Sequence, residues 1–225
     1  APTPTAGDAP TSVSSPTPTP APAATPTPAP DYVPGVTVAY AIGSGVLGSW
    51  DDKLAKATFD RPEAIARGVL ADSAVYVGEL AGRVRKADLA LTNAVTTPWT
   101  VLGMRVTGLD CDSDTIYLAD AGRHLILSKV ILLSTTGQLG TKAGAAGAAG
   151  NADGPAATAR FRSPHDVWVA GSDLFVADTG NNSIRKVGGS GTVSTVTSSV
   201  SGLNGPESVA GGPDGTIWIA DTGNH

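Results

Sequence analysis

The sequence is poor in cysteine, in phenylalanine and in long apolar runs. Its 225 residues include one Cys and three Phe, and 16% of the residues are charged. A single cysteine forms neither an intrachain disulfide nor a Cys-rich zinc site, so we expect Cys111 to be buried as a small apolar residue. The longest apolar stretch, from Leu125 to Leu133, is interrupted by Ser128 and Lys129 and is shorter than the ~20 residues of a membrane-spanning helix. The sequence therefore predicts no membrane span in this chain.

Excess charge of one sign and known catalytic motifs are also lacking. The chain has 15 Lys and Arg residues against 20 Asp and Glu, for a net charge of −5, and the basic residues are scattered. Without a basic stripe to neutralise phosphates, nucleic acid is not an expected partner. The sequence contains no Gly-x-Ser-x-Gly elbow, no His-Glu-x-x-His motif and no phosphate-binding loop. These absences favour a protein that is not an enzyme.

Residues 1–34 differ in composition from the rest of the chain. They hold eleven of the 17 prolines, which alternate with Thr, Ala and Ser, and Asp8 is the only charge before Asp31. Such a segment buries no core and favours extended, solvated polyproline II. We therefore expect residues 1–34 to be a disordered linker or stalk. Because Ser/Thr-Pro stalks are typical of exported proteins, we also expect an extracellular or cell-wall location.

Residues 35–225 contain a repeated segment. Four stretches share an apolar run, an acid and a Gly-containing turn: AVYVGELAG, TIYLADAG, DLFVADTG and TIWIADTG. The acids are Glu79, Asp120, Asp178 and Asp221, which lie 41, 58 and 43 residues apart. Short alternating runs separated by Gly, Asn and Asp predict antiparallel strands. Four strands in a period of about 42 residues indicate the blades of a β-propeller.

The repeats resemble those of the NHL family, whose signature is Phe-x-x-Pro-His, an apolar strand, and then Ala-Asp-Thr-Gly-Asn-x-x-Ile-Arg-Lys-Val. Phe161, Pro164, His165 and the stretch from Ala177 to Val187 match this signature. Glycine-rich lead-ins that begin at Gly43 and Gly147 resemble the connector of bacterial NHL proteins. The resemblance implies an all-β, NHL-type propeller with four-stranded antiparallel blades. It assigns no function, since propellers include binding proteins, scaffolds and enzymes.

The resemblance also suggests that the propeller is incomplete. We place repeats at about 42–96, 97–142, 143–197 and 198–225, with the last one truncated, and we read residues 36–41 as an outer strand. Six blades are usual in the family, and at ~42 residues each they require about 250 residues. We therefore expect residues 35–225 to form about three and a half to four blades.

Several side chains are candidates for binding. Rotational repetition would bring Glu79, Asp120, Asp178 and Asp221 into a ring of acids at the channel face, and such a ring suits Ca²⁺. Alternatively, each acid caps its own hairpin through local hydrogen bonds. Trp50, in the GSWDD loop, is a candidate surface aromatic for ligand stacking. No metal site or cofactor is predicted from a motif, and calcium is the alternative.

Other recurring residues have structural interpretations. Arg85 and Arg185, each followed by Lys, are expected on solvated outer strands. Trp168 and Trp218 lie inside strand patterns and are expected in the core. Gly180 is expected to take the left-handed conformation of a tight turn.

The sequence thus favours a non-catalytic binding or scaffold module that recognises a protein, peptide or glycan ligand. The alternative is a metal-dependent propeller hydrolase or lyase, similar to calcium-dependent lactonases, with its site partly in blades that this chain lacks.

Overall fold

The computed structural model describes residues 42–68, 74–89, 94–131, 138–196, 202–212 and 214–225. In these ranges the regular elements are strands, apart from one 3₁₀ turn, η1 (Thr179–Asn181). The predicted stalk, residues 1–34, and the predicted strand at residues 36–41 lie outside the described residues. None of the helices in the described ranges is long and apolar enough to cross a membrane.

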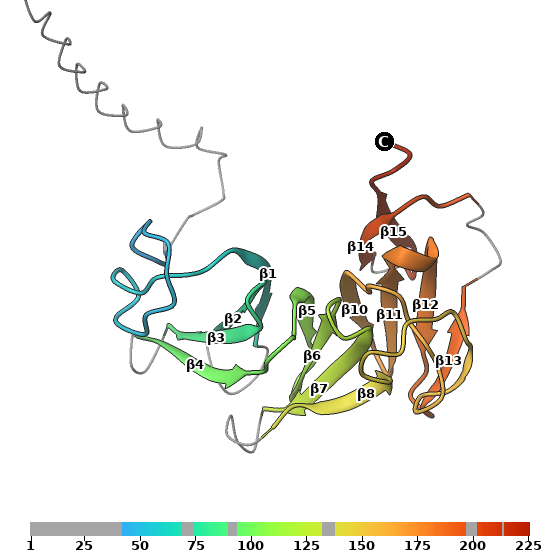
Figure 1. Ribbon diagram of the computed structural model, residues 1–225, viewed down its shortest axis with the longest axis horizontal. Helices are drawn as coiled ribbons and strands as arrows, with labels where there is room; N and C mark the ends of the chain where they lie inside the picture. The colour runs from blue at the N-terminus through green and yellow to red at the C-terminus, as the bar shows by residue number, and fades with distance from the viewer. Residues whose placement is uncertain (1–41, 69–73, 90–93, 132–137, 197–201, 213) are drawn as a thin grey trace, which may run out of the picture. The chain divides into compact units, whose positions relative to one another are not determined.

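The strands form four successive antiparallel sheets, which we call blades 1 to 4 (Figure 1). Blade 1 contains β1 (Pro62–Arg67), β2 (Ala74–Glu79), β3 (Arg83–Asp88) and β4 (Ala94–Thr100). Blade 2 contains β5 (Val106–Cys111), β6 (Thr115–Asp120), β7 (Leu125–Val130) and β8 (Gly140–Gly144). Blade 3 contains β10 (Asp166–Ala170), β11 (Asp173–Asp178), β12 (Ser183–Val187) and β13 (Thr192–Thr195), with β9 (Gly154–Pro155) as an added edge strand. Blade 4 contains β14 (Pro206–Gly211) and β15 (Ile217–Asp221).

Each blade runs from an innermost strand outward, in the order of the sequence. Consecutive strands pair as hairpins, as the alternating apolar and polar residues predict. The expectation of an all-β propeller with four-stranded antiparallel blades is therefore confirmed. Within the described ranges the sheets do not close into a ring, so the propeller is incomplete.

The turn after the acid is built differently from our expectation. Its left-handed residue is Asn182, with φ 51°, and the counterpart in blade 2 is His124, with φ 64°. Gly180 is needed for another reason: a Cβ there would lie 2.6 Å from the carbonyl oxygen of Arg162. The prediction that Gly180 supplies the left-handed conformation was wrong, because this glycine instead permits a close backbone approach.

Neighbouring blades pack through an apolar contact that recurs at each junction. The earlier blade contributes the residue before the acid and the second residue of its third strand, and the later blade contributes three apolar side chains. Between blades 2 and 3 these are Ala119 and Ile126 against Phe161, Val167 and Val176. Between blades 3 and 4 they are Ala177 and Ile184 against Leu203, Val209 and Ile219.

The junction of blades 1 and 2 has the same arrangement, but the residue before the acid is Gly78 instead of alanine. Val84 packs with Leu109 and Leu118, and a Cβ at Gly78 would lie 2.4 Å from Cγ1 of Val106. A side chain at position 78 would therefore push the two blades apart. The strand residues of the repeat thus position one blade against the next.

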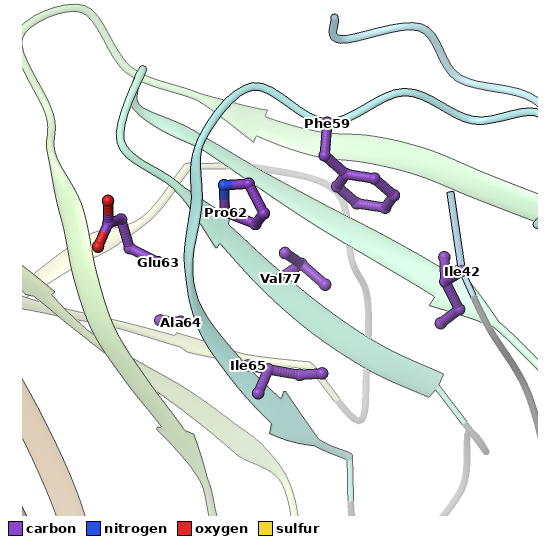
Figure 2. Close-up of a pocket in the computed structure, with 7 residues that line it drawn as sticks. All are labelled: Ile42, Phe59, Pro62, Glu63, Ala64, Ile65 and Val77. Atoms are coloured by element: carbon purple, nitrogen blue, oxygen red, sulfur yellow. The ribbon is translucent and has the colours of Figure 1, made fainter. Parts of the chain in front are cut away.

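On blade 1 the receiving surface is only partly covered by the described residues. Phe59, Ile65 and Val77, the counterparts of the receiving side chains in the later blades, line a cavity of about 390 Å³ (Figure 2). Ile65 is 69% exposed, whereas its counterpart Val167 is 3% exposed. Blade 1 therefore presents an apolar face of the kind that contacts a preceding blade elsewhere in the chain.

Three core assignments had different outcomes. Cys111 is buried, as predicted. Trp168 is partly buried and stacks on Phe175, with 5.3 Å between the ring centroids. Trp218 is 66% exposed, so its assignment to the core was wrong: no described strand of blade 4 lies beyond β15 to cover it.

Candidate binding site on the innermost strands

Three of the four innermost strands share an irregularity at their start. The register shifts between Pro62 and Ala64, and the strands β5 and β14 shift at the equivalent place. The residues passed over by these shifts are Glu63, Thr107 and Glu207. A residue in such a β-bulge has no partner in the ladder, and its side chain is turned out of the regular alternation.

His165 is the counterpart of these residues in blade 3. It follows Pro164, and its N–H donates to the carbonyl oxygen of Ala177 at 2.9 Å, directly before β10. Each blade therefore places one polar residue at the same point of its innermost strand.

These four residues line one cavity of about 350 Å³. The remaining lining residues also come from the innermost strands or from blade 4: Ala64, Ile65, Gly108, Leu109, Asp166, Ser208, Ala220 and Thr222. Because all four blades contribute, the cavity lies where their innermost strands converge. Carboxylates, hydroxyl groups and an imidazole give it both hydrogen-bond acceptors and donors.

Hydrogen bonds between blades fix this framework. The Thr107 hydroxyl donates to the carbonyl oxygen of Pro164 at 3.2 Å, and His165 Nδ1 lies 3.1 Å from the carbonyl oxygen of Glu207. The Asp166 carboxylate accepts the hydroxyl of Ser208 at 2.7 Å. Glu63 and Glu207 are exposed, so their side chains are accessible from solvent.

The four acids that the sequence singled out do not line this cavity. Glu79, Asp120 and Asp178 are fully buried inside their own blades. The Asp178 carboxylate accepts the N–H of Arg162 at 2.7 Å and the side-chain amide of Asn181 at 2.8 Å. It thereby ties the turn after β11 to the loop that leads into β10.

The same bond to the incoming loop occurs in the other blades. Asp120 accepts the N–H of Arg105 at 3.0 Å, and Asp221 accepts the N–H of Asn204 at 2.8 Å. Burial raises the pKa of Asp120 and of Asp178, and hydrogen bonds from backbone N–H groups and side chains offset part of the rise. These contacts correspond to the local capping alternative, and the binding role of the four acids stays a prediction.

The expectation of solvated arginines on the third strands was wrong. Arg85 and Arg185 are fully buried, while the next residue in β12, Lys186, is partly exposed. Strand alternation places the two basic residues of each pair on opposite faces. The face that carries the arginine is covered by the lead-in, residues 43–58 in blade 1 and 145–160 in blade 3.

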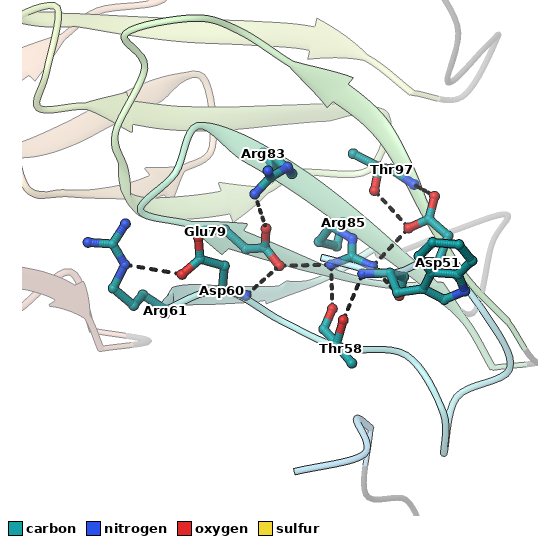
Figure 3. Close-up of polar contacts among 9 residues, drawn as sticks. Asp51, Thr58, Asp60, Arg61, Glu79, Arg83, Arg85 and Thr97 are labelled. Atoms are coloured by element: carbon teal, nitrogen blue, oxygen red, sulfur yellow. Dashed lines mark hydrogen bonds and ion pairs between the residues drawn. The ribbon is translucent and has the colours of Figure 1, made fainter. Parts of the chain in front are cut away.

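Arg85 binds its own blade and the lead-in together (Figure 3). It donates to Glu79 and to Asp51, both at 2.8 Å, and to the carbonyl oxygen of Thr58 at 2.7 Å. Its guanidinium carbon lies 4.9 Å from the centre of the Phe59 ring, a cation–π distance. Carboxylates, a carbonyl group and an aromatic face thus surround the buried guanidinium, while its Nε has no hydrogen-bond partner among the described residues.

Arg185 repeats this arrangement in blade 3. It donates to Asp178 at 2.9 Å, to Asp153, and to the carbonyl oxygens of Arg160 and Ala152 at 2.9 and 3.0 Å. Partial burial raises the pKa of Asp153. Hydrogen bonds from Arg185 and Thr195 lower this pKa by more than burial raises it, so the pKa lies below the ordinary value for aspartate.

Comparison with known proteins supports the fold. No protein-family model matches the sequence, and no curated protein matches it. Two auxiliary nutrient binding proteins, from Bacteroides ovatus ATCC 8483 and Bacteroides thetaiotaomicron VPI-5482, are similar in structure, with TM-scores of 0.63 and 0.62 and sequence identities of 19% and 18%. A protein of unknown function from Bacteroides thetaiotaomicron VPI-5482 has a TM-score of 0.59 at 20% identity.

The similarity covers most of this chain and part of each neighbour. It spans 75% of this chain and 47% of each nutrient binding protein, and 70% of this chain and 44% of the third protein. The chain therefore spans less than half the length of these structures. At this level of identity the comparison shows a shared fold alone.

Trp50, the candidate surface aromatic, is 72% exposed. Its backbone is fixed, because its N–H donates to the Thr58 hydroxyl at 2.7 Å. A role of its ring in binding stays a prediction. In the described ranges, no group of three or more His, Cys, Asp and Glu residues is placed to hold a metal ion, so calcium also stays a prediction.

Our sequence reasoning missed the four cavity residues Glu63, Thr107, His165 and Glu207 as a set. The signal was present in RPEAIA, SPHDVW and GPESVA, where a polar residue follows the proline at the start of an inner strand. We noted the proline and the strand, and we noted His165 as part of the family signature. A β-bulge cannot be recognised from the alternation of apolar and polar residues in a run of six.

Proposed function

We propose that this chain is a non-catalytic binding module, a propeller with NHL-type repeats that takes its ligand at the cavity on the innermost strands. The observation that carries the proposal is the convergence on one cavity of one residue from the start of each innermost strand, Glu63, Thr107, His165 and Glu207, three of which are bulge residues. Bulges recur beside binding sites because they redirect a side chain without disturbing the sheet. The nutrient binding proteins of similar fold are consistent with this role.

The cavity suggests the size and chemistry of the ligand. Its volume of about 350 Å³ is at the lower end of the range of ~300–1,000 Å³ that is typical of small-molecule sites. Its exposed carboxylates, Glu63 and Glu207, accept hydrogen bonds from hydroxyl or amine groups. We propose that it holds one part of a glycan, peptide or protein ligand. We further propose that the chain is exported, with residues 1–34 as a spacer.

A binding screen with matched variants tests this proposal. The full chain is applied to glycan and peptide arrays, and the affinity of each hit is then measured by calorimetry. We expect Glu63→Gln or Glu207→Gln to weaken binding by about tenfold, since a hydrogen bond to a charged group contributes about 1.5–3 kcal/mol. The control is Asp214→Asn, because Asp214 is an exposed acid that does not line the cavity.

Equal weakening by the control and the cavity variants would contradict the proposal, as would an array without hits. Loss of binding on addition of a calcium chelator would favour the metal-dependent alternative instead.

A further inference from the structure

In blades 1 and 3, the lead-in covers the edge of the outermost strand. In blade 3, β9 pairs with β13, joining Pro155 to Thr192 and Gly154 to Val193. In blade 1, the N–H of Val95 in β4 donates to the carbonyl oxygen of Asp52 at 2.7 Å. The lead-ins therefore act as added edge strands.

An aspartate of each lead-in is bound by a threonine of the outermost strand. The Asp153 carboxylate accepts the N–H and the hydroxyl of Thr195, at 3.0 and 3.1 Å. The Asp51 carboxylate accepts the same two groups of Thr97, at 2.9 and 2.7 Å. In both blades, the backbone N–H and the hydroxyl of one threonine therefore bind the carboxylate of an extended segment.

Blade 2 keeps the threonine but has no such segment. Thr141 pairs with Leu127 in β7, just as Thr195 pairs with Arg185 in β12. By register, Thr141 is therefore the blade 2 counterpart of Thr97 and Thr195. Thr141 is exposed, and in the described ranges β8 is the last strand of its sheet. Only residues 101–105 separate β4 from β5, too few to reach back along β8.

A groove lies at the place that a lead-in occupies in blade 3. It has a volume of about 440 Å³ and is lined by Pro98, Trp99, Thr100, Val101, Leu102, Arg123, Leu127, Gln138 and Leu139. By register, Gln138 and Leu139 correspond to Thr192 and Val193, the two residues that pair with β9. The groove is therefore continuous with the edge that binds a lead-in elsewhere.

The charge of the groove agrees with an acidic occupant. Arg123 takes the place of Asn181, which donates to the lead-in at the carbonyl oxygen of Gly150. The Arg123 side chain is 25% exposed, and its Nε lies 3.2 Å from a carboxylate oxygen of the buried Asp120. None of the described residues that line the groove is an acid. A carboxylate beside Thr141 would thus meet the two donors of the threonine, and Arg123 is the basic residue among the described residues that line the groove.

We propose that blade 2 binds an extended, carboxylate-bearing peptide segment of a partner protein by strand addition to β8. Strand addition supplies the backbone hydrogen bonds of the new edge, and the Thr141 N–H and hydroxyl select the carboxylate. This site is separate from the cavity on the innermost strands.

The chain supplies its own probe for this site. The peptide AAGNADGPAAT, residues 148–158 with blocked ends, carries one carboxylate, that of Asp153. It is titrated to millimolar concentration into the ¹⁵N-labelled full chain while backbone amide shifts are followed. We expect saturable shifts at Thr141, Leu139 and Arg123. The peptide with Asp153→Asn is expected to bind about tenfold more weakly, because it lacks the charged acceptor.

Matched protein variants complete the test. Thr141→Val removes the hydroxyl from an exposed strand position and keeps a β-branched side chain, and we expect it to weaken the peptide about tenfold. The control is Thr96→Val, because Thr96 is an exposed threonine on β4, next to the one that binds Asp51. Equal melting temperatures show that both variants are folded.

The absence of shifts at millimolar peptide would overturn the proposal, as would unchanged affinity in Thr141→Val. Shifts confined to blades 1 and 3 would also overturn it, because the peptide would then be displacing a lead-in.

Discussion

Replacement of Arg185 by leucine is expected to destabilise the folded chain by about 3–5 kcal/mol at neutral pH. The guanidinium is fully buried and donates to the carboxylates of Asp178 and Asp153 and to two backbone carbonyl groups. Leucine provides none of these donors, so the buried Asp178 keeps only the Arg162 N–H and the Asn181 amide. Removal of one partner of a buried pair leaves an uncompensated charge, which costs more than the intact pair contributes.

The neighbouring residue provides the control. Lys186 pairs with Asp173 at 2.6 Å, but its side chain is 39% exposed, so Lys186→Leu is expected to cost at most about 1 kcal/mol. Urea unfolding, followed by tryptophan fluorescence, measures both variants through the shift of the midpoint at constant slope. In a thermal melt, the Arg185→Leu effect corresponds to a fall in Tm of about 6–20 °C, at 2–4 °C per kcal/mol for a chain of this size.

A double variant isolates the charge effect. Arg185→Leu combined with Asp178→Asn removes the unpaired buried carboxylate, so we expect it to be more stable than Arg185→Leu alone by about 1–3 kcal/mol. A cost of Arg185→Leu no larger than that of Lys186→Leu would refute the reasoning. So would a double variant that is less stable than Arg185→Leu.

Two further predictions test local contacts. Gly180→Ala is expected to lower the free energy of unfolding by about 1–3 kcal/mol, because its Cβ would lie 2.6 Å from a backbone oxygen. The control is Gly188→Ala, which is expected to change the free energy of unfolding little, because a Cβ there would have no neighbour nearer than 3.6 Å. Equal urea midpoints for the two variants would contradict this prediction. Asp153 has a lowered pKa, so its contribution to stability is present above the ordinary aspartate pKa of about 3.9 and is lost as pH falls through the lower folded value. The Tm difference between the natural chain and Asp153→Asn should therefore shrink from pH 7 to pH 3, and a constant difference would contradict the assignment.

The blade architecture was predictable because its signals are local. Runs such as TIYLAD and DLFVAD carry the alternation of a strand, and the acids mark the period of the repeat. These features require no knowledge of contacts between distant residues. The same locality explains the mistaken expectation for Trp218, whose strand pattern was correct but whose exposure depends on a neighbouring element.

The polar features of the site depend on contacts that sequence spacing does not reveal. Arg185 is buried because Asp153, 32 residues earlier, and two lead-in carbonyl groups surround it. Likewise, Glu63 and Glu207 meet at one cavity only because rotation from blade to blade brings equivalent positions together. A residue-by-residue interpretation therefore assigns the arginines to solvent and does not single out the two glutamates.

Blade 2 shows that a blade can form without a buried arginine on its third strand. At the positions of Arg185 and Phe161 it has Leu127 and Met104, which are both buried in an apolar cluster, and its four strands pair in the same order. A blade therefore forms without the buried arginine. Arg185 takes three of its four partners from the lead-in, and blade 2 is the one that is preceded by only five connecting residues. The arginine thus fixes the lead-in to the blade. Where the lead-in is missing, an apolar pair takes the place of the arginine and its aromatic neighbour, and β8 has no further strand beside it in the described ranges.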